Sequence, residues 1–174
     1  QPPQPPQPAR RKKKEDLARE LGISRREAQA YIDLYFSRYP LVQTFIHDTI
    51  EQARAQGYVT TMMGRRRYIK DINSRNRNLR QFAERTAVNS PIQGTAADII
   101  KLAMIHCDKA IEDNRLDAKM LLQVHDELIF EVSREDALGL SLVVRKCMED
   151  ALKLNVPLKV DLKAGFNWQE MEKI

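Results

Sequence analysis

The sequence has few of the features that mark membrane proteins and disulfide-stabilised proteins. No run approaches the length of about 18 apolar residues that a bilayer-spanning helix needs, and the N-terminal region lacks the apolar core of a signal peptide. Only two cysteines occur, Cys107 and Cys147, without the close spacing of zinc or redox motifs. We therefore expect a soluble intracellular protein with no membrane partner, in which both thiols are reduced and buried.

Acidic residues are scarce in one segment, and the positive charge is concentrated there. The whole chain carries a net charge of +5. Between Gly64 and Arg85, eight basic residues accompany only two acids, Asp71 and Glu84. A basic patch of this kind fits a polyanion, of which nucleic acid is the commonest, although a solvated basic surface would give the same pattern.

The first residues lack the apolar periodicity of a folded element. Residues 1–8 are almost entirely Pro and Gln, and a nearly uninterrupted basic run follows at residues 10–14. This composition predicts a disordered or polyproline-type tail over residues 1–14. The chain also begins without Met, so we expect a fragment of a longer protein.

Helical spacing of apolar residues predicts three helices in the first third of the chain. The predicted helices cover residues 15–21, 24–39 and 41–56. Gly22 and Gly57 are suited to end the first and third, because glycine readily adopts the left-handed conformation found after a helix. Ser24 followed by Glu27 forms a capping box that starts the second.

The remaining pattern predicts a hairpin followed by helices and strands. Residues 58–63 and 65–69 predict a small hairpin that turns at Gly64. Further helices are expected at residues 78–89, 92–111 and 135–152, and strands at residues 121–124, 128–132 and 156–162. Pro91 should break or bend the join between the first two of these helices. The order of elements predicts an α+β fold with helices covering one face of an antiparallel sheet.

The segment from Leu121 to Val132 places acidic residues between two apolar strands. His125, Asp126 and Glu127 are expected at the tip of the hairpin. Two adjacent carboxylates beside buried strands are costly unless a cation neutralises them, and a divalent metal is the obvious candidate. Mg²⁺ usually takes one or two carboxylates together with waters and phosphates, so a single Asp would supply only part of a site. Solvated turn residues are the alternative explanation.

Several segments together resemble the family A DNA polymerases of the bacterial DNA polymerase I type. The string from Gln123 to Leu128 is similar to the third conserved polymerase motif of that family. Residues 63–68, 73–78, 83–85 and 89–98 resemble the segments that precede this motif, and residues 156–158 with Gly165, Asn167 and Trp168 resemble the end of those enzymes. The resemblance covers roughly residues 16–174 and keeps the order of the motifs.

This resemblance implies a fold and an activity. The fold would be α+β, with an antiparallel palm sheet that carries the catalytic hairpin and packs with helices of the fingers and palm. Residues 15–72 would form the C-terminal part of the fingers subdomain, and residues 73–174 the C-terminal part of the palm. The parent protein would be a DNA-directed DNA polymerase of the bacterial cytoplasm, associated with the nucleoid and acting in DNA replication and repair. Its partners would be primer-template DNA and deoxynucleoside triphosphates.

The resemblance also implies roles for individual residues. Asp126 would be a ligand of the catalytic metal, with two Mg²⁺ ions in the complete enzyme. Glu127 would be a neighbouring acid that shapes the site, and His125 would lie near the primer terminus. The residues implied in DNA binding are Arg85, Asn89 and Gln93 at the duplex and Arg65, Arg66 and Arg67 at backbone phosphates. Positions 85, 89 and 93 share one face if a helix continues through them.

Two parts of such an enzyme have no counterpart in this sequence. The family carries a partner metal-binding Asp on a strand and holds the triphosphate with a helix, and both precede the segments matched here. Where that helix should end, this chain has the Pro/Gln tail and the basic run. We therefore expect the chain to require the missing N-terminal part of the polymerase and to be inactive alone.

Two other interpretations remain open at this stage. The string from Asp16 to Ala28 also looks like a helix-turn-helix, as in a sequence-specific DNA-binding regulator without enzymatic activity. Such a regulator has no need for the acidic hairpin. A folded but inactive polymerase remnant would share every motif described above.

Overall fold

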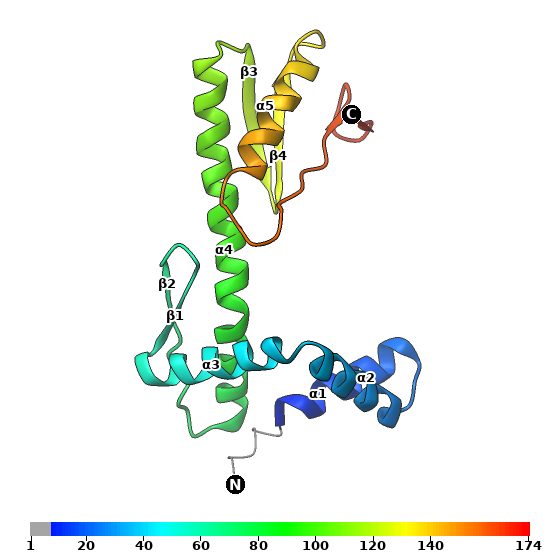
Figure 1. The fold of residues 1–174 in the computed structure, drawn as a ribbon, viewed down its shortest axis with the longest axis vertical. Helices are drawn as coiled ribbons and strands as arrows, with labels where there is room; N and C mark the ends of the chain where they lie inside the picture. The colour runs from blue at the N-terminus through cyan, green and yellow to red at the C-terminus, as the bar shows by residue number, and fades with distance from the viewer. Residues whose placement is uncertain (1–7) are drawn as a thin grey trace. The chain divides into compact units, whose positions relative to one another are not determined.

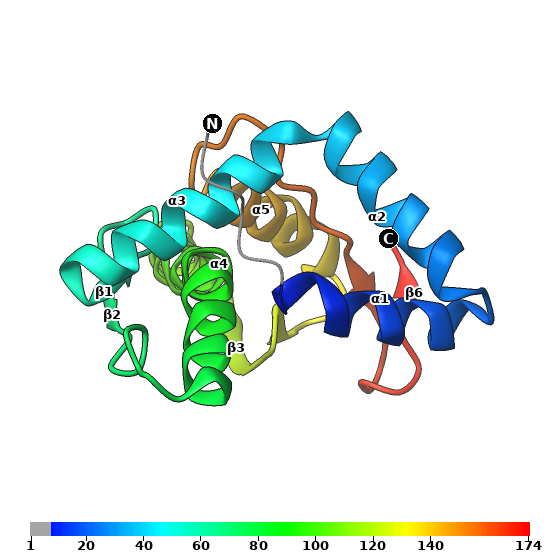
Figure 2. The same cartoon turned by 90° about the horizontal axis from the view of Figure 1, so that it is seen from below.

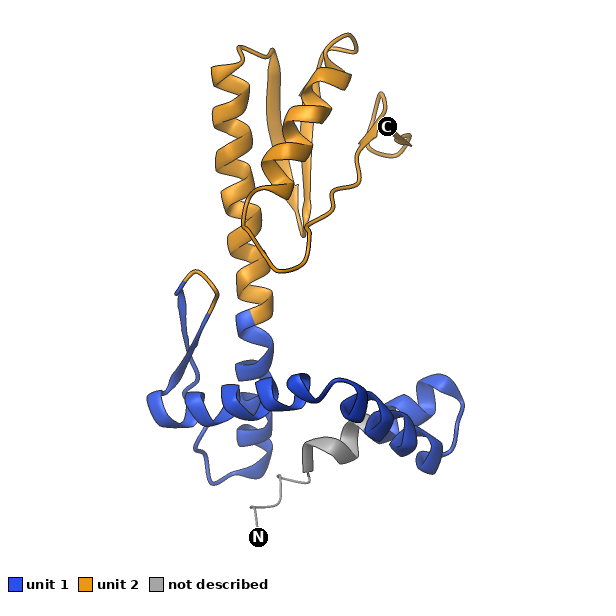
Figure 3. Ribbon diagram, in the orientation of Figure 1, with its two compact units in different colours: residues 1–60, 64–91 blue, residues 61–63, 92–174 orange. Residues whose placement is uncertain are grey.

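The structure, a computed structural model, describes residues 8–174, with side chains from Lys14 onward (Figure 1). The chain divides into two compact units, shown in separate colours in Figure 3. The first unit contains the residues up to 60 together with 64–91, and the second contains 61–63 and 92–174. None of the helices that the structure describes combines the length and the hydropathy needed to cross a membrane.

Three helices open the first unit. They are α1 (Pro8–Leu21), α2 (Arg25–Arg38) and α3 (Pro40–Gln56). Figure 2 shows α2 turning back beside α1. Helix α1 begins earlier than predicted, at Pro8, so it includes the basic run that was expected to be disordered. Proline is tolerated in the first turn of a helix, and Arg and Lys are good helix formers. Residues 1–7 of the expected tail lie outside the described residues.

The predicted start of α2 and the predicted end of α3 are confirmed by their capping interactions. The Glu27 amide donates to the Ser24 hydroxyl at 3.2 Å, and the Ser24 amide donates to the Glu27 carboxylate at 2.9 Å. Hydrogen bonding of the Glu27 carboxylate to the Ser24 side chain, and then to the Ser24 backbone, lowers the pKa of Glu27. Gly57 ends α3 in the left-handed conformation, with φ of 79°.

A short hairpin follows α3, as predicted. Strands β1 (Tyr58–Thr60) and β2 (Arg66–Tyr68) are antiparallel, and Gly64 in the connection has a φ of 79°. The apolar core of the first unit joins the hairpin to α3 and to the next helix. Its buried residues are Ala53, Val59, Ile69, Ile72, Ala83 and Ala87.

Helix α4 (Arg77–Asp113) continues through Pro91, so the predicted break at this residue is wrong. A proline inside a helix removes a backbone hydrogen bond and costs about 3 kcal/mol. Tertiary packing outweighs this local cost, because Ala87 and Cys107 are completely buried, each in the apolar cluster of its own unit. Beside the proline, the Ser90 hydroxyl donates to the Thr86 carbonyl at 2.5 Å.

The second unit is built on a longer hairpin. Strands β3 (Ala118–Val124) and β4 (Glu127–Val132) are antiparallel, with an irregular register between Met120 and Leu122. Helix α5 (Ala137–Glu149) lies against the hairpin in Figure 1. Cys107 of α4 and Leu140 and Val144 of α5 form the buried centre of a cluster that includes Met120, Leu128, Phe130 and Val132. Helices therefore cover one face of this antiparallel ribbon, as the order of elements predicted.

The two thiols are free, but only one is fully buried. Cys107 is completely buried and Cys147 is half-buried, so the expectation of two buried thiols is only partly correct. Burial, followed by the neighbouring Cys147, raises the pKa of Cys107 to about 12. The Cys147 thiol points to the carbonyl of His106 at 3.6 Å.

The predicted strand at residues 156–162 is wrong, because this segment forms neither helix nor strand. Pro157 has no N–H to give to a ladder. The Val160 amide donates instead to the Glu149 carboxylate at 3.1 Å, and only β5 (Lys163–Ala164) and β6 (Glu172–Lys173) pair beyond it. A Cβ on Gly165 would overlap the Glu170 carbonyl, so the turn between these strands requires glycine. The predicted α+β class is confirmed, although its β part consists of three separate two-stranded ribbons in the described residues.

Candidate functional site

The acidic tip is a tight turn between β3 and β4. His125 and Asp126 alone form the turn, because Glu127 already pairs with Val124 as the first residue of β4. His125 has a φ of 54°, in a region that few residues other than glycine adopt. The Gln123 side-chain amide donates to the His125 carbonyl at 2.6 Å and so stabilises the turn. The turn thereby presents Asp126 at the end of the ribbon.

The tip is open to solvent, which differs from the setting predicted from sequence. His125, Asp126 and Glu127 are all exposed, and Leu121 and Leu122 next to them are 50% and 52% exposed. The expected burial of the strands fails for Leu121 and Leu122, because the apolar cluster with α4 and α5 takes in Met120, Leu128 and Phe130 instead. Within residues 14–174, the two carboxylates form no hydrogen bond and no ion pair. Both are therefore available to a cation.

The metal-binding capacity of this chain is limited. Among the described residues, no group of three His, Cys, Asp or Glu side chains could hold a metal ion. Residues 1–13 contain none of these four residue types. Asp126 could supply one oxygen ligand to a Mg²⁺ ion. The other oxygens would come from phosphate, water or further protein groups. Asp126 does not fit a metal site made by this chain alone.

The three arginines of the β1–β2 hairpin do not form one patch. All three are exposed. Arg66 stands opposite Thr60, and Arg67 stands opposite the buried Val59. Since side chains alternate along a strand, Arg66 and Arg67 point to opposite faces of the ribbon. Arg65 precedes the strand and makes a contact within the chain.

Arg66 lies over an aromatic ring. Its guanidinium carbon lies 4.7 Å from the centroid of the Tyr58 ring. The rings of Tyr58 and Tyr68 are 5.7 Å apart in an edge-to-face arrangement with an interplanar angle of 61°. The three side chains belong to the same face of the ribbon, because Tyr58 pairs with Tyr68 and Thr60 with Arg66.

The predicted polar series at 85, 89 and 93 falls within one helix. Arg85, Asn89 and Gln93 are exposed on successive turns of α4, which continues past the proline that was expected to disturb them. Ala83 and Ala87 are buried, so Arg85 and Asn89 lie on the solvent side of the first unit. The Arg85 guanidinium carbon is 5.9 Å from the Phe82 ring centroid.

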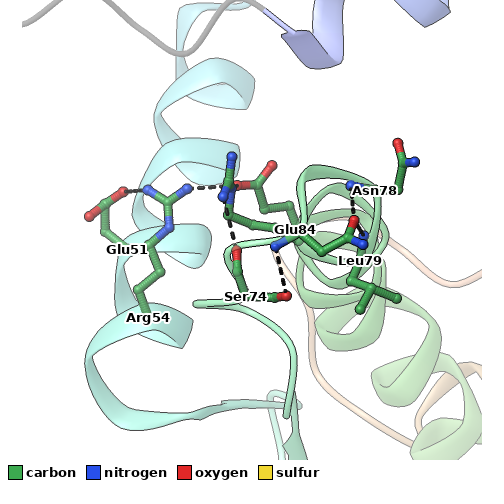
Figure 4. Close-up of polar contacts among 8 residues, drawn as sticks. Glu51, Arg54, Ser74, Asn78, Leu79 and Glu84 are labelled. Atoms are coloured by element: carbon green, nitrogen blue, oxygen red, sulfur yellow. Dashed lines mark hydrogen bonds and ion pairs between the residues drawn. The ribbon is translucent and has the colours of Figure 1, made fainter.

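An ion-pair network around Arg54 was not predicted from the sequence (Figure 4). Its guanidinium donates to Glu51 and to Glu84, each at 2.6 Å. Glu84 is also 4.0 Å from Arg80, which donates to the Ser74 carbonyl at 2.9 Å. The network ties α3 to the start of α4 and to the loop before it. The spacing of Glu51 and Arg54 suggests a helical pair, but no local pattern indicates a partner 30 residues away.

Comparison with known proteins gives consistent matches along most of the chain. A family model described as DNA polymerase family A matches residues 12–170. The chain is 53% identical over 154 residues to a DNA polymerase I of Lactococcus lactis subsp. cremoris, covering 88% of this chain and 18% of that protein. It is 51% identical over 154 residues to the DNA polymerase I of Bacillus subtilis, with the same coverage.

A solved structure agrees with these matches. The POL domain of Pol1 from M. smegmatis, in complex with DNA primer-template and dNTP, superposes with a TM-score of 0.80 and is 48% identical. The match covers 87% of this chain and 27% of that one. The chain therefore spans less than a fifth of the length of the two curated relatives named above.

Proposed function

Because this chain belongs to DNA polymerase family A, we propose that it supplies one part of the metal centre and one part of the DNA-binding surface of a template-directed DNA polymerase. In the proposed reaction, the primer 3′-hydroxyl attacks the α-phosphate of a deoxynucleoside triphosphate and pyrophosphate leaves. The observation that carries the proposal is the exposed carboxylate of Asp126 at a tight hairpin tip, which has no partner within residues 14–174. The chain that presents it matches this family over residues 12–170.

Asp126 is the proposed metal ligand. Two Mg²⁺ ions, when bound, would activate the attacking hydroxyl and stabilise the leaving oxygens. Glu127 is the proposed neighbouring acid, whose negative charge favours cations at the tip. His125, which the turn holds next to Asp126, is proposed to contact the primer terminus. The turn geometry supports these roles, since it fixes the backbone that carries all three side chains.

The basic hairpin and α4 are the proposed contacts to primer-template DNA. Arg65, Arg66 and Arg67 would bind backbone phosphates. Arg85, Asn89 and Gln93 would bind the minor-groove side of the duplex, where every base pair presents similar acceptors. Arg donates hydrogen bonds, and Asn and Gln both donate and accept them, so this series suits contact that ignores sequence. A copying enzyme requires such contact.

The remainder of the active centre is proposed to come from other parts of the polymerase. One Asp at the tip cannot hold two ions, and the described residues offer no cluster of three metal-binding side chains. In this proposal, residues 15–72 belong to the fingers subdomain and residues 73–174 to the palm. The complete protein would act on primer-template DNA and deoxynucleoside triphosphates at the bacterial nucleoid.

A regulator with a helix-turn-helix is the second candidate, because α1 and α2 do form two adjacent helices joined at Gly22, with φ of 62°. The two proposals differ in sequence dependence. We expect the 174-residue chain to bind unrelated duplexes with equal affinity, with dissociation constants on the order of 10⁻⁴–10⁻⁶ M, as in non-specific binding. Fluorescence anisotropy with several labelled duplexes, each competed by the others, measures this.

The outcome separates the two candidates. Equal affinities and equal competition support the polymerase proposal. A preference of about 1000-fold or more for one sequence is typical of a specific regulator and would favour the helix-turn-helix instead. No binding at low salt would remove the DNA-binding part of the proposal.

A further inference from the structure

The outer face of the β1–β2 hairpin carries an ordered cluster of one cation and two aromatic rings. Tyr58 and Tyr68 stand directly opposite each other, and the Arg66 guanidinium lies over the Tyr58 ring. The hairpin does not need this face for its core, because Val59 and Ile69 are buried with the first unit's apolar cluster. The Ile69 amide also donates to the Gly57 carbonyl at 2.8 Å, which closes the hairpin at its base.

We propose that Tyr58 is a positioning residue that holds the Arg66 guanidinium ready to bind a phosphate. This inference rests on the proposed function, which assigns Arg66 to phosphate. It adds the residue that prepares Arg66 for that contact. The ring attracts the cation by its quadrupole at a distance of 4.7 Å, inside the range of about 6 Å for this interaction.

An arginine that lies against an aromatic ring keeps its charge and its N–H groups for a ligand. An arginine that is paired with a carboxylate does not. Arg54 donates from its two terminal nitrogens to Glu51 and Glu84, so two carboxylates neutralise its charge. The Arg66 guanidinium lies over the Tyr58 ring, and no carboxylate among the described residues pairs with it. The N–H groups lie in the guanidinium plane, where they match phosphate oxygens. Arg66 therefore has a defined neighbour and an unneutralised charge.

Tyr68 completes the arrangement by restricting Tyr58. The edge-to-face contact at 5.7 Å holds the Tyr58 ring against rotation. Tyr68 itself is 66% exposed, so the cluster lies at the surface, where a phosphate can reach it. An arginine that is already ordered loses less side-chain freedom on binding than a free one.

Two substitutions of Tyr58 distinguish the effect of its aromatic face from the effect of its apolar volume. Tyr58→Phe keeps the aromatic face, and Tyr58→Leu keeps an apolar side chain without it. We expect Tyr58→Phe to bind a fluorescein-labelled primer-template duplex as tightly as the unmodified chain. Tyr58→Leu should bind the duplex about two- to five-fold more weakly. This factor corresponds to the interaction free energy of one exposed cation–π contact. Anisotropy titrations at one low salt concentration measure these affinities.

The decisive comparison is made in chains that lack Arg66. In Arg66→Ala, the further change Tyr58→Leu should have no effect on duplex affinity, because the residue that it positions is gone. A loss of the same size with and without Arg66 would show that Tyr58 only stabilises the hairpin, and would overturn the inference. Thermal unfolding of each variant identifies any loss that comes from a destabilised hairpin.

The phosphate could belong to the duplex or to a triphosphate, and a second titration distinguishes them. Inorganic tripolyphosphate is added to the chain bound to duplex. Displacement of the duplex that depends on Arg66 indicates a site that accepts triphosphate. No displacement of the duplex indicates that Arg66 binds the duplex backbone. Both results support a phosphate site. An unmodified chain that binds neither ligand would overturn the proposed function as well. A chain that binds duplex without any coupling of Tyr58 to Arg66 would overturn this inference alone.

Discussion

The purified 174-residue chain, incubated with primer-template, deoxynucleoside triphosphates and Mg²⁺, is expected to give no extension product. The two-metal reaction needs ions about 3.5–4 Å apart, each with its own oxygen ligands. This chain presents Asp126 and its neighbour Glu127 at one hairpin tip, and no group of three candidate ligands occurs among the described residues. Without a second ligand set, the phosphates and the attacking hydroxyl are not held in line. The expected rate is therefore that of the uncatalysed reaction.

The assay needs a control for contaminating host polymerase. A preparation of Asp126→Asn, purified in parallel, serves this purpose. The substitution removes the carboxylate charge at an exposed position, where we expect no effect on the fold. Product that appears equally in both preparations comes from a contaminant. Metal-dependent product that appears with the unmodified chain and is lost in Asp126→Asn would show that one chain is sufficient, and would contradict the account.

Charge reversal at the β1–β2 hairpin is expected to remove most of the affinity for duplex DNA. Replacing Arg65, Arg66 and Arg67 with Glu changes the local charge by six units. A pair of unit charges about 4 Å apart in water interacts by about 1 kcal/mol. After allowance for screening by salt, the reversal should weaken binding by on the order of 100-fold or more. The slope of log affinity against log salt should also become shallower by about 2 to 3, as three phosphate contacts are lost.

A matched variant tests whether the effect is local. Lys109, Lys146 and Lys153 are exposed residues of the second unit, and their replacement with Glu changes the net charge by the same amount. We expect this control to lose far less affinity. Because Arg65 also makes a contact within the chain, a variant reversed at Arg66 and Arg67 alone checks that folding is preserved. Equal losses in the hairpin and control variants would indicate an effect of net charge and no binding site at the hairpin.

The sequence correctly predicted those parts of the fold that depend on residues close together in the chain. The capping box of Ser24 and Glu27 and the left-handed Gly57 were correctly predicted, because a cap depends on residues within one turn. Pro91 was wrongly predicted as a break, since its local cost is outweighed by packing on both sides of it. Residues 156–162 alternate like a strand, but none of the strands among the described residues pairs with them. Pairing and packing of distant segments are not visible in a short window of sequence.

In the candidate site, too, the features set by neighbouring residues were predicted and those set by distant residues were not. The two apolar segments that flank residues 125–127 predicted a hairpin with Asp126 at its tip, and the structure confirms the tight turn. The same sequence wrongly suggested a buried setting, because apolar strand residues do not show which end of a ribbon the helices cover. The run of three arginines does not show their directions, whereas alternation along β2 sends Arg66 and Arg67 to opposite faces. The ion pair of Arg54 with Glu84 depends on tertiary contact and had no sequence signal.

Binding of a divalent cation at the hairpin tip tests the central claim most directly. Mn²⁺ is titrated into isotopically labelled chain in the presence of tripolyphosphate, and broadening of backbone amide signals reports which residues lie near the ion. We predict that broadening centres on His125, Asp126 and Glu127 and is abolished in Asp126→Asn. It should persist in Glu127→Gln. Broadening that ignores Asp126→Asn, or that centres on another part of the chain, would contradict the account.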